Sequence, residues 1–244
     1  MADYNTYRTA QGVGQRQAAI HEGLRAYMNK VYGLMSVGMG VTAVTAYGTA
    51  TAAMSNPAFA NLLYNTPLKY VVMFAPLLMV FAFGAAINRL SVGAATGMFY
   101  AFAALMGLSI SSIFLIFTGI SIVQTFLVTA IAFAGLSLWG YTTKKDISGW
   151  GSFLIMGVIG LIVASIVNIF LQSSGMQFAI SVLGVLIFAG LTAYDTQNIK
   201  NTYLQMQGSD ADFIGKSAIM GALRLYLDFL NLFMFLLQFM GNRN

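Results

Sequence analysis

Seven stretches of apolar residues dominate this chain, and each is long enough to cross a lipid bilayer as a helix. A bilayer core takes about 20 such residues. The predicted spans lie at about 29–53, 68–88, 91–118, 121–142, 151–172, 177–200 and 217–240. Hydrophobic residues make up 58% of the chain and charged residues 8%, whereas an average soluble domain carries about 25% charged residues. The sequence therefore predicts an all-α membrane protein with seven transmembrane helices.

The chain is divided into an amino-terminal segment and a transmembrane domain. Residues 1–27 contain no apolar run typical of a signal peptide, so we expect them to form a cytoplasmic amino-terminal segment. Ile20, Leu24 and Tyr27 share one helical face there, which indicates a helix lying at the membrane interface. Residues 28–241 form the seven-helix transmembrane domain. Within it we expect a polar loop at Ser55–Pro67 and the longest loop at Asn201–Lys216.

Lysine and arginine are distributed unevenly between the two sides of the predicted bundle. With the amino terminus in the cytoplasm, nine of the twelve lie on the cytoplasmic side and Lys69 and Arg243 on the other, while Arg224 lies inside the last span. Cytoplasmic loops of membrane proteins carry such an excess. We therefore expect a cytoplasmic amino terminus and seven crossings. The Asp and Arg of the last segment leave open the alternative that it does not cross.

Glycines recur within the predicted spans, where a small surface lets helices approach closely. We expect tight packing at nearly all of a set of nine: Gly33, Gly38, Gly40, Gly93, Gly97, Gly157, Gly160, Gly184 and Gly190.

Two aspartates inside apolar spans are the main functional clue. Asp195 lies about five residues before the inner end of the sixth span, and Asp228 about ten residues past the inner end of the seventh. These spans run antiparallel, so the depths of the two residues differ by less than roughly 10 Å at 1.5 Å per residue. A carboxylate in hydrocarbon is costly and usually faces a protein interior or a water-filled cavity. We expect the two side chains to meet.

Two adjacent carboxylates would share a proton and titrate as a unit. The protonated pair would be a closed contact between helices, whereas the deprotonated pair would repel itself and attract cations. In a structural alternative, Arg224 simply neutralises Asp228, since the two are four residues apart on one helix. Arg89, at the inner end of the second span, could reach an ionised Asp195 and hold an alternative state.

Other chemistries find little support in the residues. The chain has no cysteine, and its one histidine, His21, lies outside the spans, so no resident metal or cofactor is expected. The cations form no dense patch, which argues against nucleic acid as a partner. Intramembrane aspartyl proteases also place two aspartates on successive helices, the first after a tyrosine, as in Tyr194–Asp195. They require a glycine-rich motif before the second aspartate, where this chain has Leu225–Tyr226–Leu227, so we expect no enzyme activity.

Three passages resemble the Bax inhibitor-1 family, also called the transmembrane Bax-inhibitor-motif family. They are GLSLWGYTTKKDISGWGSFLIMGVIGLIVASIVNIF, GLTAYDTQNIK and ALRLYLDFLNLFMFLLQFMG. The resemblance covers nearly everything after about residue 25, and GYTTKKD looks most like the bacterial branch. It implies a last helix that is central and surrounded by the other six, in a multi-pass protein of the bacterial inner membrane.

The resemblance also implies a function. It points to a pH-dependent calcium leak in which Asp195 and Asp228 form the pH-sensing pair and an arginine of the second helix, best matched by Arg89, competes for Asp195. Family members are also described as regulators of cell death, stress responses or membrane-protein quality control.

Two hypotheses follow. In the first, the protein is a calcium channel gated by protonation of Asp195 and Asp228, which would bind the permeating Ca²⁺ transiently through hard oxygen ligands. Apolar side chains would block the closed path, with Phe229, Phe233 and Met234 as candidates. In the second, the protein does not conduct and regulates membrane proteases or other membrane proteins as an interaction partner.

Overall fold

The computed structural model describes the backbone of residues 3–206 and 208–244 and the side chains of residues 18–206 and 208–244. That part of the chain is helical, without β-strands. Its helices are α1 (Asp3–Ser55), α2 (Pro57–Asn65), α3 (Leu68–Ala86), α4 (Val92–Ile110), α5 (Ile113–Ile116), α6 (Gly119–Thr142), α7 (Trp150–Leu171), α8 (Ser174–Gln205) and α9 (Ala211–Met240). Seven spans, with α4 and α5 counted as one, are long and apolar enough to cross a membrane, so the predicted all-α fold with seven spans is confirmed.

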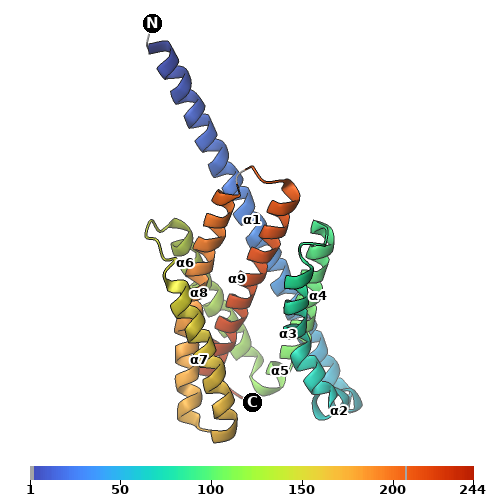
Figure 1. Cartoon of the computed structure of the whole chain (residues 1–244). Helices are drawn as coiled ribbons and strands as arrows, with labels where there is room; N and C mark the ends of the chain where they lie inside the picture. Colours follow the sequence, from blue (N-terminus) through green and yellow to red (C-terminus); the bar gives the residue numbers. More distant parts are fainter. Residues whose placement is uncertain (1–2, 207) are drawn as a thin grey trace.

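The helices form an elongated bundle from which α1 projects at the amino-terminal end (Figure 1). Helix α9 packs against α1, α4, α6 and α8, while α3 packs on α4 and α7 on α8. In the apolar stretch of α9, 61% of the residues are buried, compared with 11% in α3 and 17% in α7. The last helix is therefore the most buried of the spans, and α3 and α7 lie at the periphery.

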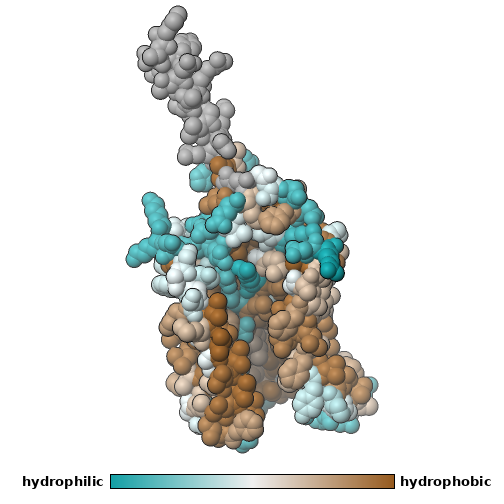
Figure 2. Space-filling model, in the orientation of Figure 1, coloured by the Kyte–Doolittle hydropathy of each residue, from teal (hydrophilic) through white to brown (hydrophobic). Residues whose placement is uncertain are grey.

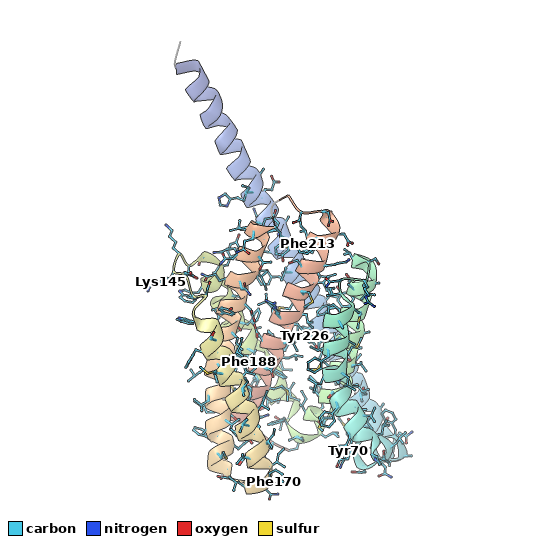
Figure 3. The ribbon with its side chains drawn as sticks, viewed as in Figure 1. Tyr70, Lys145, Phe170, Phe188, Phe213 and Tyr226 are labelled. Atoms are coloured by element: carbon cyan, nitrogen blue, oxygen red, sulfur yellow. The ribbon has the colours of Figure 1, made fainter. Side chains whose placement is uncertain are left out.

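Tyr226 forms the centre of that core, midway along α9 (Figure 3). It is completely buried, and its ring meets Phe99 and Phe102 edge-on, each at 5.7 Å between centroids. Its hydroxyl lies 2.6 Å from the hydroxyl of Thr42 on α1. One side chain thus joins α9 to α1 and α4.

Local sequence signals explain where several spans begin. A side-chain oxygen before the first turn accepts a hydrogen bond from a free backbone N–H, which favours helix initiation. Four spans start in this way, with the caps Ser91, Thr118, Ser173 and Asp210.

Two predicted loops are wrong. The segment expected as a polar loop at Ser55–Pro67 contains α2, which Asn56 caps and whose first residue is Pro57, a favoured starting position. The loop expected at Asn201–Lys216 is much shorter, because α8 continues to Gln205 and α9 begins at Ala211. The first turns of α9 are stabilised by the Asp210 cap and by a 2.8 Å ion pair between Lys216 and Asp212.

The amino-terminal segment continues directly into the first span, because α1 is unbroken from Asp3. Leu24 and Tyr27, two residues of the predicted interfacial face, are buried. Tyr27 lies 3.1 Å from the hydroxyl of Ser217 on α9. This part of the face therefore packs on the bundle, and placement of residues 1–27 at the membrane surface stays a prediction.

The prediction of tight packing at nearly all of the nine glycines is wrong for five of them. A β-carbon added at Gly38, Gly157, Gly184 or Gly190 would collide with a side chain of another helix, so these four permit close approach. The other five have open space at that position: Gly33, Gly40, Gly93, Gly97 and Gly160. Glycine spacing alone does not reveal which face of a helix meets a neighbour.

A broad apolar surface covers the length of the bundle, with polar side chains gathered toward the amino-terminal end (Figure 2). Large apolar side chains are exposed on the peripheral helices, for example Phe81 on α3 at 69% and Phe170 on α7 at 82%. Water would not tolerate so much exposed apolar surface, so these side chains face lipid.

Candidate functional site

The two predicted aspartates meet between α8 and α9. Asp228 is only 4% exposed, Asp195 is partly buried, and their carboxyl groups lie close enough to share a hydrogen bond when one of them is protonated. The structure therefore brings together two residues that are 33 positions apart in the chain. Asp195 lies in the carboxyl-terminal half of α8, and Asp228 lies just past the midpoint of α9.

The chemistry of this contact requires a proton. An ionised carboxylate only accepts hydrogen bonds, so two carboxyl groups can bond to each other only when one is protonated. Within the described part of the chain, the buried Oδ2 of Asp228 receives no hydrogen bond from an N–H or hydroxyl group. The arrangement therefore suits a carboxyl pair that holds a proton between its members.

Close helix packing on both sides fixes the position of Asp195. A β-carbon added at Gly140 on α6 would lie 2.3 Å from the backbone oxygen of Ala193, and one at Gly151 on α7 would lie 2.5 Å from the Tyr194 hydroxyl. On the other side, a β-carbon at Gly221 on α9 would lie 3.3 Å from Ile199. These three glycines let α6, α7 and α9 approach α8 around the acidic pair.

Arg224 lies one turn before Asp228 on α9 and interacts electrostatically with both aspartates. Its side chain is exposed. Among the described side chains, the only ion pair within 4 Å joins Lys216 to Asp212. The structural alternative, in which Arg224 and Asp228 form a neutralising contact pair, is therefore not the arrangement observed.

Arg89 lies in the exposed turn that follows α3, three residues beyond the end of that helix. The charged group that influences Asp195 is Arg224 on α9. The structure does not bring Arg89 to the acidic pair, and its role in an alternative state stays a prediction.

One face of α9 carries polar residues that the sequence reasoning did not single out. Asn231 and Gln238 follow Arg224 at intervals of seven residues, which is nearly two helical turns, so the three share a face. Arg224 and Gln238 are exposed, and Asn231 is partly exposed. Figure 1 shows this helix uncovered between α8 and α3, and Figure 2 shows the molecule hollowed there. The seven-residue spacing was a signal that could have revealed this polar face.

Hydrogen bonds continue from the polar face at the end of the bundle opposite the amino terminus. Gln177 on α8 donates to the Oε1 atom of Gln238 at 2.7 Å. Asn168 on α7 donates to Gln177 at 3.2 Å. The polar face of α9 thus extends from the acidic pair to an amide cluster near the far membrane surface.

The loop between α6 and α7 is attached to α8 close to the acidic pair. The side chain of Gln197 accepts a hydrogen bond from the backbone N–H of Ile147 at 2.9 Å and donates to the backbone oxygen of Lys145 at 2.8 Å. In the same loop, hydrogen bonds from Ser148 hold the pKa of Asp146 below its usual range. Gln197 therefore links two of the three passages that carry the family resemblance.

The predicted apolar plug lies on another face of α9. Phe229 is buried and meets Phe126 and Phe133 of α6, both at 5.4 Å between ring centroids. Phe233 is also buried and lies 6.2 Å from Phe126, and Met234 is partly buried. These residues pack between α9 and α6, and their role as a plug stays a prediction.

Fold and site together define a multi-pass helical membrane protein with an intramembrane carboxyl pair. The chain matches the family described as "Inhibitor of apoptosis-promoting Bax1" over residues 24–244. It therefore belongs to the Bax inhibitor-1 family, and the family predicted from the sequence is confirmed.

Relatives are similar over nearly their whole length. The chain is 46% identical to the inner membrane protein YbhL of Escherichia coli, over 91% of this chain and 93% of that protein. It is also 46% identical to an uncharacterized protein of Caulobacter vibrioides, covering 99% and 98% of the two chains. A Rickettsia prowazekii protein is 41% identical over 100% of this chain. The predicted membrane localisation is confirmed, and the name of the Escherichia coli relative agrees with an inner membrane.

Proposed function

We propose that the protein is a pH-sensitive cation leak, conducting Ca²⁺, in which protonation of the Asp195–Asp228 pair closes the path. The observation that supports this most strongly is the close approach of the two carboxyl groups at a buried position between the helices. The pair joins α8 to α9 at the edge of the polar face of α9. A contact that depends on one proton can couple helix packing to pH.

The gating step follows from electrostatics. When the pair holds its proton, the hydrogen bond keeps α8 and α9 together. When the proton leaves, two negative charges remain side by side in a poorly solvated site and repel each other. Separation of the helices lets water enter, and the carboxylates then supply oxygen ligands for Ca²⁺. Two carboxylates are far fewer than the six to eight oxygen ligands that Ca²⁺ prefers, which suits passage better than storage.

The route we propose runs along the polar face of α9. Asn231 and Gln238 follow Asp228 toward the opposite end of the bundle, and Arg224 lies one turn before it. Polar side chains inside a membrane usually line a pathway or contact another protein. The exposed guanidinium of Arg224, near both aspartates, would compete with the cation for their charge.

We further propose that the amino terminus is cytoplasmic and that α9 is the central helix. Figure 3 places Lys145 near the amino-terminal end of the bundle and Tyr70, the neighbour of Lys69, near the other end. The excess of lysine and arginine on the amino-terminal side supports this orientation. The high burial of α9 supports its central position. In this proposal the protein acts as a channel rather than as an enzyme.

Calcium flux from liposomes tests the proposal. Purified protein reconstituted with an enclosed calcium dye should leak faster as pH rises, by at most about tenfold per pH unit if one proton controls the step. Asp195→Asn and Asp228→Asn should each show low flux with little pH dependence, because a single carboxylate has no partner to repel.

Asp212→Asn is the matched control, since Asp212 is exposed on the same helix and should leave the pH profile unchanged. Equal and negligible flux through the native protein and both variants would instead favour the second hypothesis, a non-conducting regulator of other membrane proteins.

A further inference from the structure

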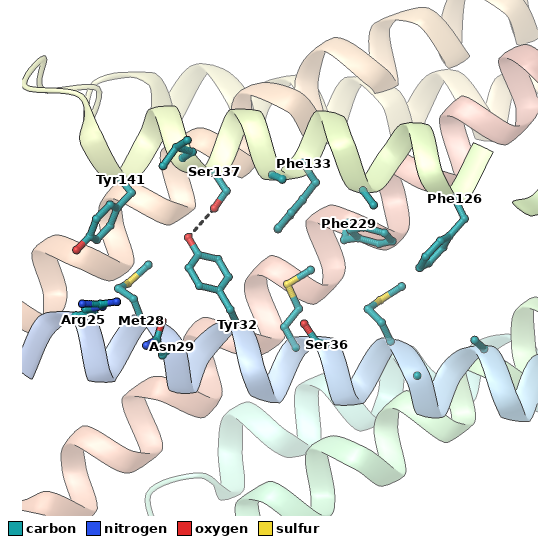
Figure 4. A pocket seen from close by; sticks show the side chains of 17 residues that line it. Arg25, Met28, Asn29, Tyr32, Ser36, Phe126, Phe133, Ser137, Tyr141 and Phe229 are labelled. Atoms are coloured by element: carbon teal, nitrogen blue, oxygen red, sulfur yellow. Dashed lines mark hydrogen bonds between the residues drawn. The ribbon is translucent and has the colours of Figure 1, made fainter. Parts of the chain in front are cut away.

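A long cleft lies between α1 and α6, and neither aspartate of the acidic pair lines it. Its volume is about 690 Å³, within the range of small-molecule sites. Arg25 and Ala43 of α1 both line it, so its length is roughly 27 Å at 1.5 Å per residue. Phe229 of α9 forms part of its floor. Figure 4 shows the cleft along its length, between the ribbons of α1 and α6.

The cleft opens toward the membrane rather than toward water. Several lining residues on its two rims are exposed, among them Gly40 and Ala43 on α1 and Ala134 and Leu138 on α6. The only hydrogen bond between the facing walls joins the hydroxyls of Tyr32 and Ser137 at 2.6 Å, among the described side chains. A molecule could therefore enter sideways from the bilayer.

The two ends of the cleft differ in chemistry. At the amino-terminal end, Arg25, Asn29 and Tyr141 gather, and the hydroxyl of Tyr141 points toward Arg25 (Figure 4). The ammonium group of Lys200 lies beside this end, donating a hydrogen bond to the backbone oxygen of Tyr141 at 2.7 Å. Among the side chains that the structure describes, no acidic one lines the cleft.

The remaining length is mainly apolar. Its walls are mostly methionine, phenylalanine, alanine and glycine residues, with Tyr32, Ser36 and Ser137 as the polar exceptions and Phe126 near the end opposite Arg25 (Figure 4). Empty apolar space of this size inside a membrane would be filled by hydrocarbon, which is the surrounding solvent. The shape is thus a cationic head site joined to a long hydrocarbon slot.

We infer that this cleft binds an anionic phospholipid, with the phosphate at Arg25 and Lys200 and one acyl chain along the slot between α1 and α6. Basic pockets between transmembrane helices on the cytoplasmic side are suited to anionic headgroups. Under the proposed orientation Arg25 lies on that side. A half-bilayer is about 15 Å thick, so the cleft is long enough for an acyl chain entering from that leaflet. The inference does not depend on ion conduction.

Native mass spectrometry of the purified full-length protein tests the inference. The probes are phosphatidylglycerol and phosphatidylcholine with identical acyl chains. The first phosphatidylglycerol should bind about tenfold more tightly than phosphatidylcholine, since both lipids carry a phosphate but the ammonium of choline would lie beside two cationic side chains. Arg25→Gln should remove most of that preference, and Arg25→Lys should keep part of it.

A cleft-filling variant tests the slot. Ala134→Trp, which fills the cleft, should weaken binding of the first phosphatidylglycerol by roughly tenfold, as loss of a well-packed acyl chain requires. The matched controls should bind normally: Lys144→Gln removes a loop cation away from the cleft, and Val163→Trp adds an indole to the exposed surface of α7. Melting temperatures verify folding, and Ala43→Trp replaces Ala134→Trp if that variant is unstable.

Two results would overturn the inference. One is equal binding of both lipids by the native protein. The other is phosphatidylglycerol binding that stays within about twofold of native in folded Arg25→Gln or in a folded cleft-filling variant. The first outcome would mean that the lipid phosphate does not bind at Arg25, and the second that no acyl chain lies in the slot.

Discussion

Tyr226→Ala should lower the free energy of unfolding by about 3–5 kcal/mol, as expected for truncation of a fully buried aromatic residue. Tyr226 has no exposed surface and contacts Phe99, Phe102 and Thr42 on two other helices. Its removal leaves a cavity where α1, α4 and α9 meet. Thermal unfolding in detergent, followed by circular dichroism, should show a large decrease in melting temperature.

Tyr226→Phe is the matched control for that prediction. It keeps the ring and removes only the hydroxyl, so the expected cost is about 1 kcal/mol. Thr42 remains satisfied, because its hydroxyl also lies within hydrogen-bonding distance of the backbone oxygens of Gly38 and Ala103. Equal destabilisation by both variants would show that the hydroxyl pair, rather than ring packing, holds these helices together.

Gly140→Ala should destabilise the protein by about 1–3 kcal/mol, the usual cost of overpacking a close contact. The added β-carbon would lie 2.3 Å from the backbone oxygen of Ala193, and that backbone cannot rotate away as a side chain could. Helices α6 and α8 would have to separate at Ala193, which lies two residues before Asp195. The same unfolding measurement reports the effect.

Gly135→Ala provides the comparison within the same helix. Its β-carbon meets nothing within 4 Å, and alanine is favoured over glycine in a helix by up to about 1 kcal/mol. The two identical substitutions should therefore have opposite signs. A neutral result for Gly140→Ala would mean that α6 and α8 are less closely packed than the structure shows.

Hydropathy and charge predicted much of this fold, because lipid imposes simple demands on a sequence. Spans such as 151–172 stand out by length alone, and α7 begins and ends within one residue of that prediction. Antiparallel neighbours and helical rise also sufficed to place Asp195 beside Asp228. The bounds of the spans and the proximity of the two aspartates both follow from the depth of each residue in the membrane.

Rotation of each helix about its axis could not be predicted from depth. This is why Gly93 and Gly97 were expected in a close contact and instead have open space, while Gly140 was missed. For a related reason, the sequence did not reveal that α3 ends at Ala86, before Arg89, and packs on α4. The cleft between α1 and α6 arises from the distance between these two helices. That distance could not be predicted from the residue pattern of either helix.

The central claim is that Asp195 and Asp228 hold one proton between them and release it when the path opens. Infrared titration of the protein in bilayers measures this directly, through the carbonyl band of a protonated carboxyl group. We predict that the native band disappears over the pH range in which calcium efflux rises, and that Asp195→Asn and Asp228→Asn each abolish this transition. A band that is insensitive to pH, or a titration that is identical in the native protein and both variants, would contradict the claim.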